Sequence, residues 1–341
     1  MERRDLGTSG LRITPVGIGT WAMGGSGWGG TWGEQDDAES IAVIRAGIEG
    51  GANWIDTAPV YGLGHAEEVV GRALKQLSGD ERPLVFTKCG FEWEEGDPDS
   101  IRQNIAPQRI RDELEACLRR LDLDSIDLFQ VHWPDLTTPG GEAVPLEESW
   151  GALAQLADEG KVRAIGVSNF TVEQLDRCEA IRHVDSIQPP FSLIGRTAMS
   201  DVIPWAREHG TGVIAYSPMQ SGLLTDGASL ERVAKFEDGD WRIGAPEFTS
   251  PRLERNLALR DALKPIAARH GCSVAAVAVA WVAGVPGVTG AIVGGRSATQ
   301  AHAWLAGGSV QLTDADRVEI DAALAQTRAG EDWTVYPNPG G

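Results

Sequence analysis

Short apolar runs alternate with longer stretches of helical period along almost the whole chain, and this alternation predicts the secondary structure. The runs that predict strands lie at residues 16–19, 53–56, 84–87, 126–131, 162–167, 186–188, 212–215 and 288–293. The stretches that predict helices lie at residues 37–49, 66–77, 107–121, 146–159, 172–181, 201–209, 260–284, 299–306 and 314–326. A small hairpin is expected before the first strand, formed by residues 4–6 and 11–13.

This order of elements favours a closed α/β barrel. Eight predicted strands, each followed by a helix and with no proline- or glycine-rich linker between them, are typical of a (β/α)8 TIM barrel. A doubly wound sheet would also alternate, but that fold usually has fewer strands before a domain boundary. We therefore expect one domain over residues 1–341, with an N-terminal hairpin over about 1–15, long loops at the C-terminal face and a tail over about 327–341.

Charge and composition narrow the function. The chain has 341 residues, and 49 acidic against 30 basic side chains give a net charge of −19. This charge disfavours nucleic acid or a membrane as a partner, and a phosphate-bearing ligand would need a local cluster of cations. The N-terminus lacks a signal-like apolar segment and the most apolar stretch, 273–285, is too short to span a bilayer, so a soluble cytoplasmic protein is expected. The four cysteines form no C-x-x-C pair, so neither a metal site nor a disulfide framework is expected.

Four ionisable side chains follow three neighbouring strands of the predicted barrel. Asp56 ends the second strand and Tyr61 follows it, Lys88 ends the third, and His132 ends the fourth. Barrel enzymes build their active sites at these strand ends. Each residue alone has an ordinary structural explanation, such as a helix cap, a solvated rim charge or core packing. Together they suggest proton transfer, in which Lys88 and Asp56 would lower the pKa of Tyr61 from about 10.

Further motifs at strand ends carry a family resemblance. They are GIGTW at 17–21, DTAPVYG at 56–62, Thr87-Lys88, Val131-His132, GVSNF at 166–170, Gln188, YSPM at 216–219 and GGR at 294–296. In this order, over nearly the whole chain, they resemble the aldo-keto reductases. The resemblance implies NADPH-dependent reduction of an aldehyde or ketone, with Tyr61 as proton donor, Lys88 and Asp56 tuning it, and His132 orienting the carbonyl. It implies no metal.

The resemblance also implies where the cofactor binds. Ser168, Asn169 and Gln188 would bind the nicotinamide carboxamide, and the ring would stack on Tyr216. Ser168 and Asn169 also precede a predicted helix, where they fit an N-cap. The remaining cofactor positions implied by the resemblance are Gly19, Thr20, Trp21, Ser217, Pro218, Met219, Gly222 and Gly294. The spacing of Gly17, Gly19 and Ala22 imitates a dinucleotide fingerprint, but the glycine-rich segment that follows forbids a helix there.

The last strand is followed by a candidate phosphate site. Arg296 and Gln300 resemble the phosphate-binding turn and helix start of the family, and the guanidinium favours NADP over NAD. The chain departs from the family pattern at Val293, where proline is usual, at Trp304, where asparagine is expected, and at Phe191, where many relatives carry tyrosine.

The substrate is less constrained. Trp21 and Trp133 flank strand ends and are expected to wall a pocket for a small-molecule carbonyl compound or a sugar. Acidic residues at 92–97 would repel an anion, although they also fit a solvated face. Two alternatives stay open: an NADP-dependent sugar or polyol dehydrogenase, and a non-enzymatic NADP-binding subunit that senses redox state. The pattern leaves the oligomeric state open.

Overall fold

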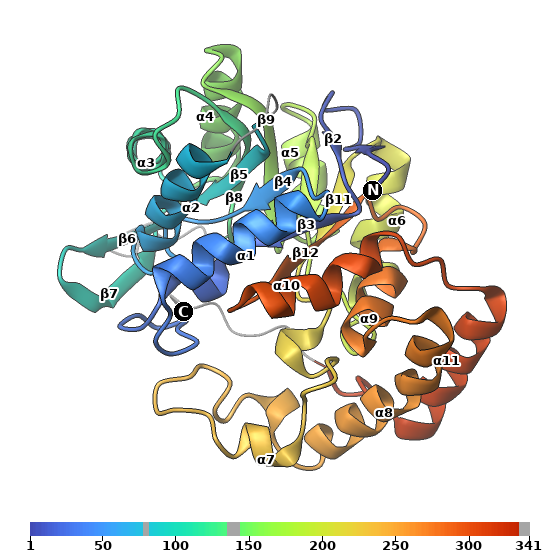
Figure 1. Ribbon diagram of the computed structural model, residues 1–341. Coiled ribbons are helices and arrows are strands. Elements are labelled where there is room, and N and C mark those ends of the chain that lie inside the picture. Colours follow the sequence, from blue (N-terminus) through green and yellow to red (C-terminus); the bar gives the residue numbers. More distant parts are fainter. Residues whose placement is uncertain (78–81, 135–143, 334–341) are drawn as a thin grey trace.

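Eight parallel strands close into a barrel in this computed structural model, which describes residues 1–77, 82–134 and 144–333 (Figure 1). The strands follow one another around the barrel in chain order, and β12 closes it by pairing with β3, where Ala291 lies opposite Val16. The strands are β3 Val16–Gly19, β4 Trp54–Asp56, β5 Leu84–Cys89, β8 Ile126–Val131, β9 Val162–Ser168, β10 Ser186–Gln188, β11 Gly212–Ala215 and β12 Gly290–Gly294. The prediction of a TIM barrel is confirmed.

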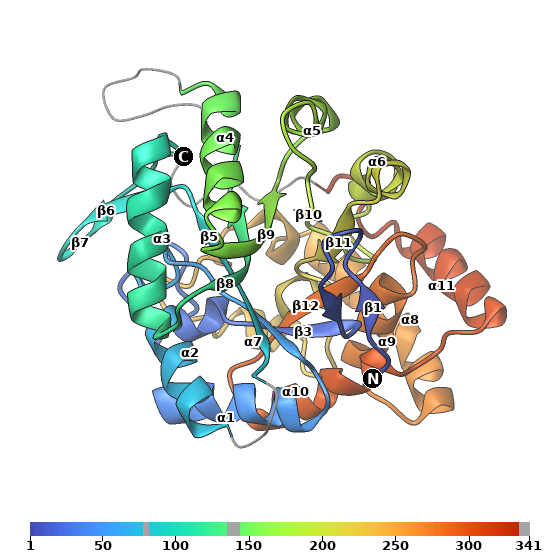
Figure 2. The ribbon, with the colours of Figure 1, turned by 90° about the horizontal axis from the view of Figure 1, so that it is seen from above.

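Helices surround the barrel on its outside (Figure 2). They are α1 Asp37–Glu49, α2 His65–Gln76, α3 Pro107–Leu121, α4 Leu146–Asp158, α5 Val172–Glu179, α6 Val202–His209, α7 Leu230–Val233, α8 Arg252–His270, α9 Val274–Ala283, α10 Ala298–Leu305 and α11 Asp314–Thr327. Within the described residues no single helix is long and apolar enough to cross a membrane. The tail beyond residue 333 lies outside the described residues.

One predicted helix is wrong, because the stretch 260–284 contains a sharp break. The first part belongs to α8, which already begins at Arg252, and the second part is α9, bent from α8 by 89°. Gly271 ends α8 in the left-handed conformation at φ 59°. Ser273 then caps α9 by accepting a hydrogen bond from the backbone of Ala276. Gly271 is therefore the C-cap of α8, and Ser273, two residues later, is the N-cap of α9.

The N-terminal hairpin closes the bottom of the barrel. Its strands β1 Arg4–Asp5 and β2 Arg12–Ile13 pair antiparallel, as expected from the sequence. Leu6, Leu11 and Ile13 are buried in one cluster with apolar side chains from the barrel strands, among them Trp54 and Phe86. The N-terminal end of the barrel is therefore filled with apolar side chains, which leaves the opposite rim for chemistry.

A second hairpin lies where the sequence suggested only an acidic loop. Strands β6 Phe91–Glu94 and β7 Asp97–Gln103 pair antiparallel directly after β5 and project from the barrel (Figure 1). Arg102 donates to Glu92 across the pair at 2.8 Å. Part of the acidic charge of this segment is thus neutralised within the hairpin itself.

Candidate active site

A buried ion pair lies at the C-terminal rim of the barrel. Lys88, in β5, donates from Nζ to Asp56 Oδ1 at 2.6 Å and to the carbonyl oxygen of Thr57 at 3.0 Å. The Lys88 side chain is 0% exposed and that of Asp56 is 3% exposed. Burial lowers the pKa of Lys88, and the carboxylate of Asp56 opposes that shift. The strand ends thus bring a lysine and an aspartate together in a place that water barely reaches.

The second carboxylate oxygen of Asp56 is also bound. Gln188, at the end of β10, donates from Nε2 to Asp56 Oδ2 at 2.9 Å. Gln130, in β8, donates weakly to the same oxygen at 3.5 Å, and its Oε1 lies 3.3 Å from Gln188 Nε2. Gln130 was not among the predicted site residues, although a glutamine within the otherwise mostly apolar run of β8 indicates a polar contact inside the barrel. These contacts form one polar network under the rim.

Tyr61 and His132 lie beside this network. The Lys88 Nζ lies 5.3 Å from the centroid of the Tyr61 ring. The rings of Tyr61 and His132 meet edge to face, with centroids 5.8 Å apart. Burial, and secondarily the positive charge of Lys88, holds the pKa of His132 well below its usual range. The imidazole is therefore neutral at pH 7, and its Nδ1 is buried without a hydrogen bond to any described residue.

The expected direction of the Tyr61 pKa shift is wrong. Burial, and secondarily the negative charge of Asp56, raises the pKa of this phenol well above its ordinary value. The pairing of Lys88 with Asp56 is present as expected, with Nζ 2.6 Å from Oδ1, but the carboxylate largely neutralises the positive charge beside the phenol, and burial then sets the direction of the shift. In this state Tyr61 is a protonated phenol across the neutral range, which is the form that donates a proton.

Two buried carboxylates hold β5 on either side of Lys88. Glu67, from α2, accepts from the Thr87 hydroxyl at 2.6 Å. Glu113, from α3, accepts from the backbone N–H of Gly90 at 2.9 Å, and burial raises the pKa of Glu113 to about 8. Both carboxylates come from the buried faces of amphipathic helices, where an acidic residue indicates a buried polar partner.

The candidate nicotinamide contacts gather on the next three strand ends. Ser168 Oγ donates to the carbonyl oxygen of Gln188 at 2.8 Å. Asn169 has a left-handed backbone at φ 64°, and its Nδ2 donates to the His132 carbonyl oxygen at 3.0 Å. The Tyr216 hydroxyl donates to Asn169 Oδ1 at 2.8 Å. The four residues therefore lie on one continuous part of the rim, next to His132.

The segment after Tyr216 bends sharply at the rim. Left-handed backbone occurs at Ser217, Gln220, Ser221 and Gly222, with φ values of 56°, 46°, 52° and 96°. Ser221 Oγ is buried and makes no hydrogen bond to a described residue, Pro218 is buried and Met219 is half-buried. Successive left-handed residues with an unused hydroxyl are suited to a polar ligand group.

The two expected tryptophans, Trp21 after β3 and Trp133 after β8, pack against the same apolar cluster as Tyr61. Gly19 lies opposite Gly294 in the closing strand pair, and the Thr20 backbone donates to the Asp56 carbonyl oxygen at 3.0 Å. Trp21 stacks on Tyr61, with ring centroids 6.3 Å apart and planes 21° apart. Trp133 packs into the same aromatic cluster. The cluster forms an aromatic wall at the Tyr61 end of the site.

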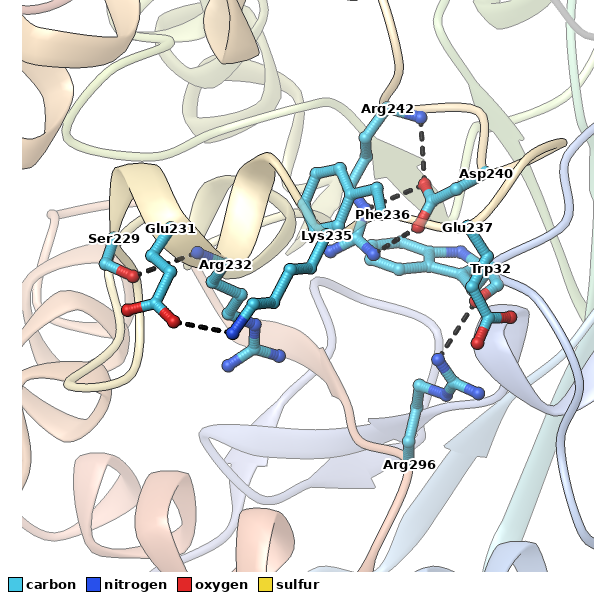
Figure 3. A pocket seen from close by; sticks show the side chains of 10 residues that line it. All are labelled: Trp32, Ser229, Glu231, Arg232, Lys235, Phe236, Glu237, Asp240, Arg242 and Arg296. Carbon is cyan, nitrogen blue, oxygen red and sulfur yellow. Dashed lines mark hydrogen bonds and ion pairs between the residues drawn. The ribbon is translucent and has the colours of Figure 1, made fainter.

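A pocket of about 400 Å³ lies where the connection between β11 and α8 approaches the start of α10 (Figure 3). We call it the arginine pocket, because Arg232, Arg242 and Arg296 line it. Of these three arginines, only Arg296 was predicted from the sequence as a phosphate-binding residue. Its backbone N–H donates to Gln300 Oε1 at 2.8 Å, as a helix-start turn would arrange. The other two arginines lie in a connection whose folding no periodicity predicted.

Comparison with known proteins agrees with this geometry. The family model described as "Aldo/keto reductase family" matches residues 15–325. The Aldo-keto reductase YhdN of Bacillus subtilis is 37% identical over 96% of this chain and 95% of that protein. The NADH-specific methylglyoxal reductase of Escherichia coli is 32% identical over 93% of this chain and 96% of that enzyme.

Solved structures agree as well. The glycerol dehydrogenase AKR11B4 from Gluconobacter oxydans superposes with a TM-score of 0.84 and 38% identity, covering 98% of both chains. The aldo-keto reductase AKR11C1 from Bacillus halodurans, at 24% identity and a TM-score of 0.76 over 95% of this chain and 96% of its own, supports the fold. The protein described here belongs to the aldo/keto reductase family of oxidoreductases.

Proposed function

We propose that this protein uses NADPH to reduce the carbonyl group of an aldehyde or ketone to an alcohol, with Tyr61 as the proton donor. The observation that carries the proposal is the buried Lys88–Asp56 pair, with Tyr61 and His132 beside it at one rim. A developing alkoxide is stabilised by a protonated phenol that donates a proton, a neutral imidazole that donates a hydrogen bond, and the positive charge of a fixed ammonium.

Each side chain has a separate task in the proposed reaction. A nicotinamide bound at this rim would supply the hydride for the carbonyl carbon. Tyr61 transfers the proton of its hydroxyl to the carbonyl oxygen, and the charge of Lys88 stabilises the phenolate that remains. Asp56 holds Lys88 in place, and His132 hydrogen-bonds the carbonyl oxygen through an imidazole that stays neutral.

The residues present fit a nicotinamide dinucleotide. Ser168, Asn169 and Gln188 offer hydroxyl and amide groups for the carboxamide, and Tyr216 offers a ring face for stacking. Ser221 Oγ, which has no partner among the described residues, is a donor available to the cofactor. Gly19, Thr20, Trp21 and the segments at 217–222 and 294–300 complete the proposed binding surface.

The cationic lining of the arginine pocket supports NADPH over NADH. Arg296, for which the sequence suggests a phosphate-binding role, contributes to this lining. Family membership alone does not decide the cofactor, since the E. coli relative is named as NADH-specific. A phosphate-bearing cofactor is the better match for guanidinium groups in a chain with a net charge of −19.

The proposed substrate is a neutral or cationic carbonyl compound or a sugar. Trp21 and Trp133 form its wall, and the acidic hairpin of β6 and β7 disfavours anions. Oxidation of a polyol is the second candidate, favoured because a structural relative at 38% identity is named as a glycerol dehydrogenase. Both reactions would use the same four side chains in opposite directions.

NADPH absorbance, followed with aldehydes, ketones, sugars and polyols in both directions, tests the proposal. Tyr61→Phe keeps the ring and removes the acid, so turnover should fall by about 10²- to 10⁴-fold while NADPH affinity stays unchanged. A variant that keeps most of its activity would exclude Tyr61 as the donor. A wild-type protein that binds NADPH but turns over no substrate in the panel would favour the redox-sensing alternative.

A further inference from the structure

The arginine pocket holds more positive charge than its own ion pairs neutralise. Lys235 binds Glu231 at 2.5 Å, and Arg242 binds Asp240 through two nitrogens. Among the described residues that line the pocket, these pairs leave two guanidiniums, those of Arg232 and Arg296, and one carboxylate, that of Glu237. The lining of the arginine pocket thus carries a net positive charge although the whole chain is acidic, and this charge favours the binding of an anion.

Arg296 has already used most of its donors. Its Nε donates to Gln35 Oε1 at 2.9 Å, one terminal nitrogen donates to the Trp32 carbonyl oxygen at 3.0 Å, and the other donates to the carbonyl oxygen of Glu34. These bonds fasten the segment before α10 to the loop after β3. Arg296 therefore acts first as a structural tie, because each of its three guanidinium nitrogens already donates to the loop after β3.

Arg232 is in the opposite situation. Its guanidinium makes no hydrogen bond or ion pair with any described residue, and Figure 3 shows it at the pocket without an interaction line. A guanidinium carries five N–H donors in a planar fork that matches a phosphate. These donors are available to a ligand without the loss of an existing contact.

The backbone that leads into Arg232 is held in place at the start of α7. Arg260, from α8, donates to the carbonyl oxygens of Asp226 and Ala228, just before α7. Ser229 caps α7 by accepting from the Arg232 backbone N–H at 3.1 Å. A Cβ atom added at Gly227 would lie 2.9 Å from Arg232 Nη1, so the guanidinium rests against this glycine. Such support reduces the entropy that ligand binding would otherwise cost.

The three guanidiniums of the pocket also repel one another. Burial, followed by the charges of Arg242 and Arg296, lowers the pKa of Arg232. A bound dianion would replace this repulsion with attraction, as a phosphate does between arginines elsewhere in proteins.

We infer that Arg232 is the principal side chain that binds the 2′-phosphate of NADPH, while Arg296 ties the pocket wall together. This inference rests on the proposed function and adds to it a cofactor-selecting residue from the connection after β11. It also explains how one chain could prefer NADPH although Arg296 is occupied.

Dissociation constants for NADPH and NADH, measured from protein fluorescence in wild type and variants, test the inference. Arg232→Gln should weaken NADPH by roughly 10- to 100-fold, the effect of losing a charged hydrogen bond, and leave NADH unchanged. Arg232→Lys should give an NADPH dissociation constant between those of wild type and Arg232→Gln, because lysine keeps the charge but lacks the planar pair of N–H donors. Glu237→Gln should tighten NADPH and not NADH. The matched control Arg119→Gln, on the exposed side of α3, should change neither.

The outcomes separate this inference from the proposed function. A wild-type protein that binds neither cofactor would overturn both. A wild type that binds NADPH and reduces carbonyls, together with an Arg232→Gln variant that loses both cofactors equally or neither, would overturn only the role of Arg232. If Arg296→Gln selectively weakens NADPH affinity and Arg232→Gln does not, Arg296 and not Arg232 binds the 2′-phosphate, and the inference is wrong.

Discussion

Asp56→Asn removes the negative charge beside a buried ammonium while keeping the size of the side chain. Lys88 is 0% exposed, and its other described polar contact is the neutral carbonyl oxygen of Thr57. Removing one partner of a buried pair costs about 3–5 kcal/mol, because the remaining charge has no compensation. The asparagine oxygen still accepts a hydrogen bond from Lys88, so we expect the lower end of this range.

Urea unfolding followed by tryptophan fluorescence measures the loss. With a slope of about 3 kcal/mol per molar, the midpoint should fall by about 1 M. The matched control is Asp5→Asn, which breaks the exposed pair with Arg12 and should cost less than about 1 kcal/mol. The double variant Asp56→Asn with Lys88→Met removes both charges and should recover most of the lost stability, although it should be inactive.

The pH dependence of the single variant follows from the sign of the Lys88 shift. Burial depresses the pKa of this lysine in the folded state, whereas the unfolded chain keeps the ordinary value of about 10.4. Between these values the unfolded state binds more protons, so stability rises with pH. Asp56 opposes this depression, so Asp56→Asn should lower the pKa of Lys88 further, and the deficit of the variant should shrink as the pH rises toward the pKa of Lys88 in wild type. A single variant as stable as wild type, or a double variant no better than the single one, would refute the reasoning.

Two further predictions concern the pocket wall and the support of β5. Trp21→Ala removes a ring that stacks on Tyr61, so the Michaelis constant for a small aldehyde should rise while bulkier aldehydes gain; equal changes in kcat/KM for both would show that Trp21 is structural. Glu113 has a pKa raised to about 8 against about 4.3 unfolded, so wild type should lose stability as pH rises between these values. Glu113→Gln cannot ionise, so its advantage in urea midpoint over wild type should grow from pH 5 to pH 8; parallel pH curves would contradict this.

The architecture was accessible from the sequence because each strand and helix buries one face with its own period. The eight strands were found within a few residues of their observed bounds. The α8–α9 break was missed because apolar residues continue on both sides of Gly271 and outweigh its capping signal. The β6–β7 hairpin was missed because charged residues on both of its strands hide the alternation.

The site was accessible only in part. Strand ends converge in any barrel, so the positions of Asp56, Lys88 and His132 followed from the fold. Their electrostatics did not follow, since the direction of the Tyr61 pKa shift depends on burial and on which atom Lys88 contacts. That the Arg232 guanidinium has no hydrogen-bond or ion-pair partner among the described residues could not be predicted either, because side-chain contacts in irregular loops follow no sequence period.

The pairing of β3 with β12 has a consequence for how the chain folds. Residue 16 pairs with residue 291, a separation of 275 residues, and Arg4 donates to the Ala283 carbonyl oxygen at 2.7 Å beside the same seam. At about 5–20 residues per second, a ribosome needs roughly 15 to 55 seconds to supply the second half of this seam. During that time one edge of β3 has no partner strand, and the apolar side chains of the N-terminal hairpin lack their contacts with β11 and β12. Until the barrel closes, the nascent chain exposes an unpaired strand edge and apolar side chains. A chain truncated before residue 290 should therefore aggregate rather than form a smaller soluble barrel.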